Sequence, residues 1–237
     1  MRDRIKGLAT ELLIRHGYHG VSFGDIARTL DTTRANVHYH FGNKLSLVEE
    51  LLDDYLQETL TAFRAIWTDG STTFFGKIEA TVEYNRRRFL KFNPGNDTRL
   101  PWSLISRMRL DADMLSDKGR KALQGFADEL HTYVISGIRS AKARGELAAS
   151  APVEDIALQM VAIVNSAGPI TQDAGNFDRL EQLYLAVGRV VIHAYGKRDA
   201  GAASGAAGLA PVAAPPVPVA PAGTPAAARA RSMATEL

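Results

Sequence analysis

The chain has 237 residues, of which 46% are hydrophobic and 23% are charged, and its formal net charge is +2. This balance is typical of a soluble globular protein with a substantial core, and the nearly neutral charge does not by itself indicate nucleic-acid binding. The absence of cysteine excludes disulfides and thiolate metal sites and is compatible with a cytoplasmic protein. The apolar run at 156–164 has about half the length that a membrane span needs, so we expect no membrane partner.

Two short helical patterns, separated by a polar turn, lie between residues 22 and 44. Ile26 and Leu30 share one face of the first helix, and Val37 and Phe41 share one face of the second. The two faces are expected to pack against each other, which leaves the outer face of the second helix free. This arrangement is typical of a helix-turn-helix.

Capping residues support the same division. Ser22 is a favourable N-cap, and Asp25, three residues later, is a short form of the capping-box acid. Thr33 is expected to cap the second helix, and Asn43 a third helix that begins at Lys44. That third helix would present a cation and free backbone N–H groups to a DNA phosphate.

The free outer face carries donors, acceptors and aromatic rings suited to a major groove. Arg34 and Asn36, on the first turn, are predicted to contact base edges, with Tyr39 against a thymine methyl group. The remaining side chains are predicted to hold phosphates or to complete the surface. The full predicted set is Ser22, Thr33, Arg34, Asn36, His38, Tyr39, His40 and Lys44.

Residues 2–52 resemble the DNA-binding domain of the TetR (tetracycline-repressor) family of bacterial transcription regulators. The resemblance rests on Ile5, Leu8-Ala9, Leu12-Leu13, Gly17-Tyr18, Asp25-Ile26-Ala27, Val37, Phe41, Lys44 and Leu47. The family pattern usually has Gly-Val where this chain has Asp31-Thr32, and Tyr where it has His38. We expect Asp31 to accept a left-handed turn with modest strain, and the His38 imidazole to replace the tyrosine contact with a phosphate.

The rest of the chain is also patterned as helices, and no alternating strand pattern competes. The expected helices are 44–68, 72–92, 101–115, 117–145, 153–167 and 177–196, the break after 167 being assigned to Gly168-Pro169. The predicted fold is therefore all-α with about nine helices. The predicted domains are a DNA-binding domain at 1–47, an effector-binding and dimerisation domain at 48–198 and a disordered Ala/Pro/Gly-rich tail at 199–237, which has no aromatic residue.

The resemblance implies a homodimeric repressor that binds a near-palindromic operator on double-stranded DNA and is released by a small, mostly apolar effector. Apolar stripes on the last two helices are the predicted dimer interface: Ile156, Met160, Ile163, Val164, Leu183, Val187, Gly188 and Val191. Large apolar side chains of the middle helices are the candidate effector pocket: Trp67, Phe75, Tyr84, Phe89, Trp102, Met108, Phe126 and Tyr133. For each of these eight, plain core packing is the competing interpretation.

Two charged clusters have a simpler explanation than a site. Arg86-Arg87-Arg88 would suit an anionic ligand, but consecutive helical residues point about 100° apart, so a solvated face is the favoured interpretation. Asp111, Asp113 and Asp117 lack a histidine at ligand spacing, and no metal or cofactor is expected.

No motif of a known enzyme class is present, so the chain is not expected to be an enzyme. The alternative to a DNA-binding regulator is a helical interaction or adaptor protein whose first three helices serve only for packing. The polar outer face of the second helix argues against that alternative, because packing alone gives it no role.

Overall fold

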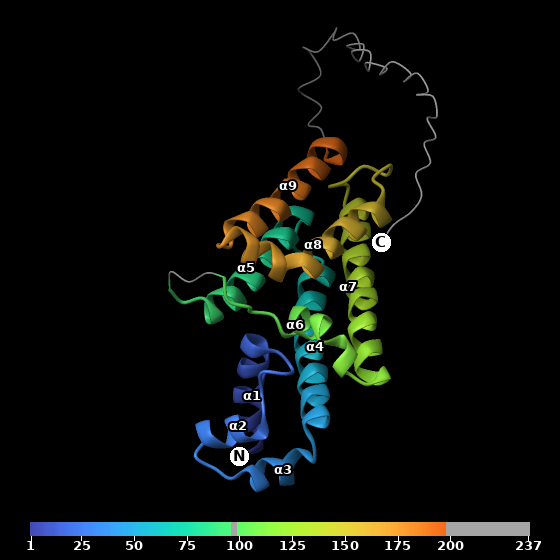
Figure 1. Ribbon diagram of the computed structural model, residues 1–237. Helices are drawn as coiled ribbons and strands as arrows, with labels where there is room; N and C mark the ends of the chain where they lie inside the picture. The colour runs from blue at the N-terminus through green and yellow to red at the C-terminus, as the bar shows by residue number, and fades with distance from the viewer. Residues whose placement is uncertain (96–98, 198–237) are drawn as a thin grey trace, which may run out of the picture. The chain divides into compact units, whose positions relative to one another are not determined.

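One long helix, α4 (Lys44–Thr68), connects three short N-terminal helices to a larger helical body (Figure 1). The computed structural model describes residues 1–95 and 99–197, which form one compact unit. Within these ranges there are nine α-helices and one 3₁₀ turn, and no strand; an isolated bridge pairs Leu147 with Gly196. The predicted all-α fold is thus confirmed, whereas the tail expected at 199–237 lies outside the described residues.

The N-terminal helices are α1 (Arg2–His16), α2 (Phe23–Thr29) and α3 (Arg34–Phe41). Buried apolar side chains from these helices pack with the first turns of α4, and the core that they form comprises Ile5, Ala9, Leu13, Ile26, Val37, Phe41 and Leu47. Because α4 continues from this core into the body, the proposed division at residue 47 falls inside a single helix.

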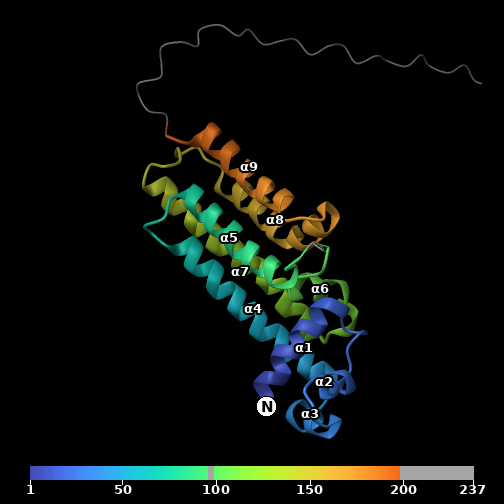
Figure 2. The same cartoon turned by 90° about the vertical axis from the view of Figure 1, so that its left-hand side faces the viewer.

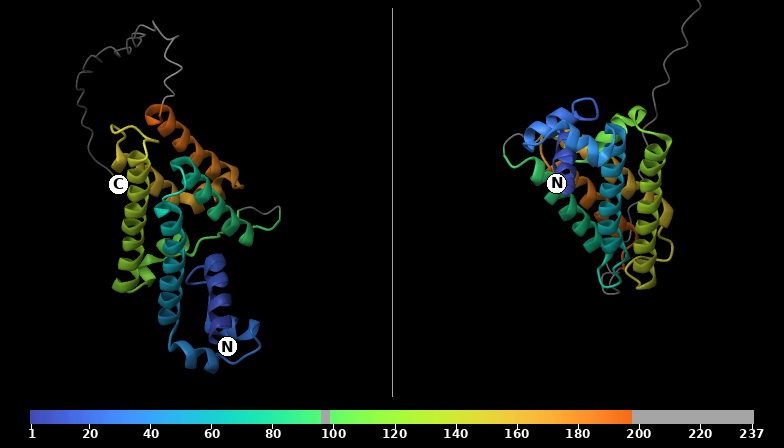
Figure 3. Two further views of the ribbon diagram at one scale, coloured as in Figure 1. Left: turned by 180° about the vertical axis from the view of Figure 1, so that it is seen from behind. Right: turned by 90° about the horizontal axis from the view of Figure 1, so that it is seen from below.

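The body consists of α5 (Phe74–Phe92), α6 (Leu104–Leu110), the 3₁₀ turn Ala112–Met114, α7 (Asp117–Ala143), α8 (Val153–Ala174) and α9 (Asp178–Tyr195). Figure 2 shows α8 and α9 side by side on the side of the body away from α4, with α9 also packing on α5. Seen from behind in Figure 3, α4 lies between α7 and α1. No helix among the described residues is long and apolar enough to cross a membrane.

The far end of α4 is fixed by a close approach and by a buried cation. Gly137 of α7 lies where an added Cβ would stand 2.7 Å from the Trp67 ring, so α7 approaches α4 closely there. Lys77 is fully buried, and its Nζ donates to the carbonyl oxygens of Ile66 and Asp69. A cation at this end offsets the unpaired carbonyls of the last helical turn.

Two of the predicted helices have different bounds in the structure. The segment expected at 101–115 contains only the short α6 and the 3₁₀ turn, and Ser103 caps α6 by accepting from the Ser106 N–H. The predicted end of the next-to-last helix at 167 is wrong, since α8 continues through Pro169 to Ala174.

A side chain from another helix explains why α8 tolerates its proline. Pro169 has no N–H for the carbonyl oxygen of Asn165, four residues earlier. The guanidinium of Arg109, in α6, donates to that oxygen at 3.4 Å and to Asn165 Oδ1 at 2.9 Å. This long-range contact replaces the missing helical donor, which no local sequence pattern reveals.

Candidate DNA-binding surface and ligand cavity

The predicted N-caps of α2, α3 and α4 are all present. Ser22 and Asp25 form a reciprocal capping box, with Asp25 N donating to Ser22 Oγ at 3.2 Å and Ser22 N to Asp25 Oδ2 at 3.0 Å. Hydrogen bonds from Ser22 also lower the pKa of Asp25. Thr33 Oγ1 accepts from Asn36 N at 3.1 Å, and Asn43 caps α4. These caps fix the start and the direction of each helix.

The turn between α2 and α3 contains a residue in the left-handed region, as expected. Asp31 has a φ of 50° and is the one non-glycine residue with positive φ among the described residues. Aspartate tolerates this conformation better than most residues, although glycine would adopt it without steric cost. The turn therefore has its left-handed residue at the position that the sequence predicted.

The outer face of α3 is largely free of intramolecular contacts. Tyr39 is 85% exposed, and Arg34 and His38 are also exposed, while Val37 on the opposite face is fully buried. Asn36 differs, because it is half-buried and its Nδ2 donates to Thr32 Oγ1 at 2.9 Å. The structure thus presents Arg34 and Tyr39 openly and ties Asn36 to the turn.

Of the remaining predicted DNA contacts, Ser22 and Thr33 are exposed and His40 is half-buried, while His38 meets the Phe23 ring edge-on. Lys44 is half-buried with its Nζ over the Tyr18 ring, 4.2 Å from the centroid, and burial lowers its pKa. An ammonium held against a ring has less freedom to follow a phosphate than an exposed one.

The surface of α8 and α9 differs from the stripes predicted for dimer contact. Ile156, Met160 and Val191 are buried in the protomer, and Gly188 lies against α5, where an added Cβ would meet Phe75 and Ile78. Ile163, Val164 and Val187 are half-buried, and Leu183 is 37% exposed. The outward apolar residues of α9 are instead Leu183, Ala186, Val190 and Ala194, and Leu158 of α8 is also exposed.

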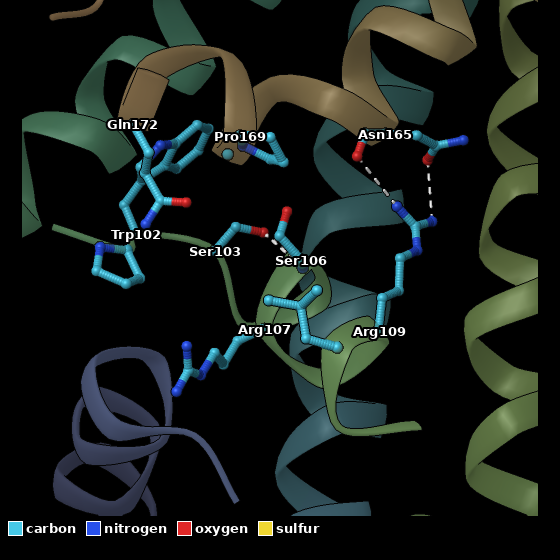
Figure 4. Close-up of a pocket in the computed structure, with 11 residues that line it drawn as sticks. Trp102, Ser103, Ser106, Arg107, Arg109, Asn165, Pro169 and Gln172 are labelled. Carbon is cyan, nitrogen blue, oxygen red and sulfur yellow. Dashed lines mark hydrogen bonds between the residues drawn. The ribbon is translucent and has the colours of Figure 1, made fainter. Parts of the chain in front are cut away.

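A cavity of about 160 Å³ lies between α6 and α8 (Figure 4). Its lining is Pro101, Trp102, Ser103, Ser106, Arg107, Arg109, Leu110, Asn165, Gly168, Pro169 and Gln172. A narrower inner space continues the same wall and adds Thr59, Phe63, Asn85, Arg88, Ile105, Phe126 and Val164. Gly168 lets α8 approach α6 closely at this wall, because an added Cβ would stand 3.0 Å from Ser106 Oγ.

The eight aromatic and methionine residues proposed for the pocket are spread through the body. Trp102 and Phe126 line the spaces just described. Trp67, Phe89 and Met108 are core residues, Phe75 packs near Gly188, and Tyr133 hydrogen-bonds Glu129 at the surface. Tyr84 accepts a hydrogen bond from Arg88. Arg88 therefore does not lie on the solvated face that the sequence predicts for it.

The polar residues of the cavity were missed because their signal is not local. Arg88 follows two arginines that pair with Glu181 and Glu83 outside the cavity, and only packing separates it from them. Arg109 follows an ordinary amphipathic pattern and is identified only through Asn165 and Pro169. The three aspartates considered as metal ligands are placed otherwise, Asp111 accepting from Tyr18 N and Asp117 pairing with Arg120.

Comparison with known proteins supports the N-terminal assignment. Residues 7–51 match the family model described as bacterial regulatory proteins, tetR family. The chain is 36% identical over 53 residues to the HTH-type transcriptional regulator QacR of Staphylococcus aureus, covering 22% of this chain and 28% of that protein. It is 33% identical over 63 residues to the negative transcriptional regulator IcaR of the biofilm operon icaADBC in the same species, covering 25% and 34%. The matches thus span about a third of the length of these relatives.

The whole described fold also has solved counterparts. A TetR transcriptional regulator from Legionella pneumophila superposes with a TM-score of 0.65 at 16% identity, covering 81% of this chain and 97% of that one. A TetR-family regulator from Agrobacterium tumefaciens gives 0.66 at 19% identity, covering 83% and 97%. At these identities the likeness concerns the fold. The segment with closer sequence relatives is the one that contains α2 and α3.

Proposed function

The chain is a member of the TetR family of bacterial regulatory proteins, and from this premise we propose that it is a homodimeric repressor of transcription, located with its DNA in the cytoplasm. The observation that carries the proposal is the outer face of α3, where Arg34, His38 and Tyr39 stand exposed on a helix whose other face is buried. A short helix held this way fits a major groove. The proposed operator is double-stranded and near-palindromic, since a two-fold dimer presents two copies of α3.

The proposed contacts follow from exposure. Arg34 is suited to a guanine edge, and Tyr39 to a thymine methyl group. Ser22, Thr33 and Lys44 lie at helix N-termini and His38 lies within α3, and these four are assigned to phosphates, with His40 at the margin. We assign Asn36 mainly to the turn, because its amide already donates to Thr32.

The proposed dimer forms through α8 and α9. The exposed apolar residues of α9, and Leu158 on α8, would remain in contact with water if the protein were a monomer. Packing against a second copy removes these residues from water, and a two-fold arrangement pairs each α9 with its own copy.

Release by an effector is proposed through α6. One side of α6 lines the cavity with Ser106 and Arg109, while Asp111 at its C-terminal end accepts a hydrogen bond of 2.8 Å from the Tyr18 N–H beside α1. A ligand that moves α6 would therefore act directly on the DNA-binding helices. The ligand must favour one position of α6 by roughly 1–3 kcal/mol to change operator affinity usefully.

Selection of bound genomic fragments by the full-length protein tests the function. The expected result is a recurrent near-palindrome with half-sites about one helical turn or a multiple apart. Arg34→Ala should abolish the enrichment and keep the fold. If the wild-type protein retains no DNA above background, the regulator assignment fails and the adaptor alternative replaces it.

A further inference from the structure

Two arginines in the body contact only neutral groups of the described residues. Arg88 and Arg109 take part in none of the ion pairs found there. By contrast, Arg144 pairs with Glu146 at 2.7 Å. The buried Lys77 is also outside these ion pairs, but its Nζ donates to two carbonyl oxygens at the end of α4. The two unpaired guanidiniums therefore need a separate explanation.

Arg88 is held by neutral groups only. Its Nη1 donates to Thr59 Oγ1 at 2.9 Å and to Tyr84 Oη at 2.5 Å, and its guanidinium carbon lies 4.3 Å from the centre of the Tyr55 ring. These contacts orient the plane of the guanidinium without neutralising its charge. Burial acts to lower the pKa of Arg88, but its contacts with Tyr55 and Tyr84, hydrogen bonds included, raise it overall.

The Arg109 guanidinium is likewise hydrogen-bonded only to uncharged oxygen atoms. Both of its hydrogen bonds go to Asn165, and burial lowers its pKa. Taking a guanidinium out of water costs free energy that neutral acceptors recover only in part. An anion placed beside it would recover more, because the attraction is stronger where water is excluded.

Both cations border the narrower inner space, which has a volume of about 20 Å³ and is partly open. They line it together with Ser103 and Ser106, whose hydroxyls can donate, and with the apolar Phe63 and Phe126. Arg109 also borders the cavity of about 160 Å³ shown in Figure 4, where Trp102, Leu110 and Pro169 add apolar wall. Arg107, which pairs with Asp111, lines the cavity on the side away from Arg109, so the lining combines cations with apolar surface.

We propose that this cavity binds a small apolar organic acid, with the carboxylate held between Arg88 and Arg109 and the hydrocarbon body against Trp102 and Leu110. The regulatory meaning of this site rests on the proposed function, since α6 carries Arg109 and also contacts Tyr18 through Asp111. The effector is then not simply apolar, as the sequence indicated, but an acid with an apolar body. A planar carboxylate suits the guanidinium fork better than a spherical ion.

The test measures binding without DNA. Full-length protein is titrated by calorimetry with benzoate, phenylacetate, cyclohexanecarboxylate and octanoate, and with the primary amide of each acid. The amides keep the shape and remove the charge. At least one acid is expected to bind about tenfold or more tightly than its amide. Phenyl phosphate and inorganic phosphate form a further arm, and tighter binding of either one would replace the carboxylate assignment.

Variants then locate the charge. Arg109→Gln and Arg88→Lys are expected to weaken the bound acid about tenfold and to leave its amide unaffected. Arg87→Gln is the matched control, because Arg87 is exposed on the same helix and pairs with Glu83, and it should bind the acid like the wild type. Circular dichroism and the midpoint of thermal unfolding identify any variant that fails to fold, and either arginine variant alone then decides.

The proposal is overturned if no acid of the panel binds, if the amides bind as tightly, or if both arginine variants bind the acid like wild type. A gel shift on the selected operator, without ligand, is measured in parallel. Operator binding with no acid binding would reject the site and keep the regulator. Acid binding without operator binding would reject the proposed function and keep the site.

Discussion

Arg34 and Lys44 are both cations of the proposed DNA-binding surface, but their surroundings differ. Arg34 is exposed on the first turn of α3 and takes part in no ion pair found among the described residues. Lys44 is half-buried at the start of α4 with its ammonium against Tyr18. An exposed side chain near the end of an inserted helix reaches base edges, whereas one beside a helix N-terminus lies near the backbone.

Substitution of these two residues should therefore have different effects. Arg34→Ala should cost roughly 1–3 kcal/mol on the operator and flatten discrimination among related sequences. Lys44→Ala should weaken all sequences about equally and reduce the salt dependence by about one phosphate contact per subunit. Salt titrations of each variant on matched and scrambled operators measure both effects. Identical behaviour of the two variants would contradict this assignment.

The left-handed residue in the turn gives a prediction about stability. Asp31→Gly should raise the free energy of unfolding by about 0.5–1 kcal/mol, because glycine removes the steric cost of a φ of 50°. Asp31→Val should lower it, since a β-branched side chain fits this conformation poorly. Chemical denaturation of the three proteins measures the difference. A less stable glycine variant would show that the Asp31 side chain stabilises the turn by more than its backbone strain costs.

At the scale of elements, α1 is attached to α4 by charges as well as by its core. Glu50 accepts from Arg2 Nη2 at 2.6 Å and from Lys6 at 2.9 Å, and Lys6 also pairs with Asp54. The hydrogen bond from Arg2, followed by the contributions of Lys6, lowers the pKa of Glu50 from 4.5 to about 2. The contact joins the first turns of both helices, so its loss should loosen α1.

This pKa gives the contact a defined pH dependence. The carboxyl is more acidic in the folded protein, so its stabilising effect is complete above pH 4.5 and is lost as the pH falls towards about 2. Glu50→Gln should therefore be less stable than wild type near neutral pH, and the two should converge in acid. Glu83→Gln, which removes a more exposed pair with Arg87, is the control. A stability difference that is constant across this pH range would contradict the charge-based explanation.

At the scale of the whole molecule, the outward apolar residues of α9 should determine the oligomeric state. Val190 is one of them and is 66% exposed. Val190→Asp is expected to shift the protein to monomer and to weaken operator binding strongly, because each monomer contributes only one α3. Sedimentation velocity at micromolar concentration measures the state. Leu90→Asp, at a residue 53% exposed on α5, is the control and should remain dimeric.

The sequence predicted best what depends on neighbours in the chain. The caps at Ser22, Thr33 and Asn43 involve partners three residues away, and the turn at Asp31 is set by local backbone preference. Helix positions followed from apolar periodicity for the same reason. The fold class and the exposed face of α3 could be predicted because both follow from these local patterns.

What the sequence could not predict depends on contacts between distant segments. The apolar stripes of α8 and α9 showed only that these helices have buried faces, and packing on α5 decided that Gly188 faces inward. Arg88 is indistinguishable by composition from its two neighbours. The continuation of α8 past Gly168-Pro169 depends on a donor from α6. Treating this Gly-Pro pair as a helix breaker therefore placed the predicted end of the helix too early.

The same proline has a consequence for where positive charge can be placed in the body. A residue able to donate at position 169 would bond the Asn165 carbonyl within α8, and Arg109 would lose one of the two acceptors that hold it. Pro169→Ala should then leave the Arg109 guanidinium held by Asn165 Oδ1 alone, and so less firmly fixed at the cavity wall. Because Pro169 has no N–H, the carbonyl oxygen of Asn165 stays available to Arg109. A proline in α8 therefore helps to hold a cation of α6 at the cavity wall.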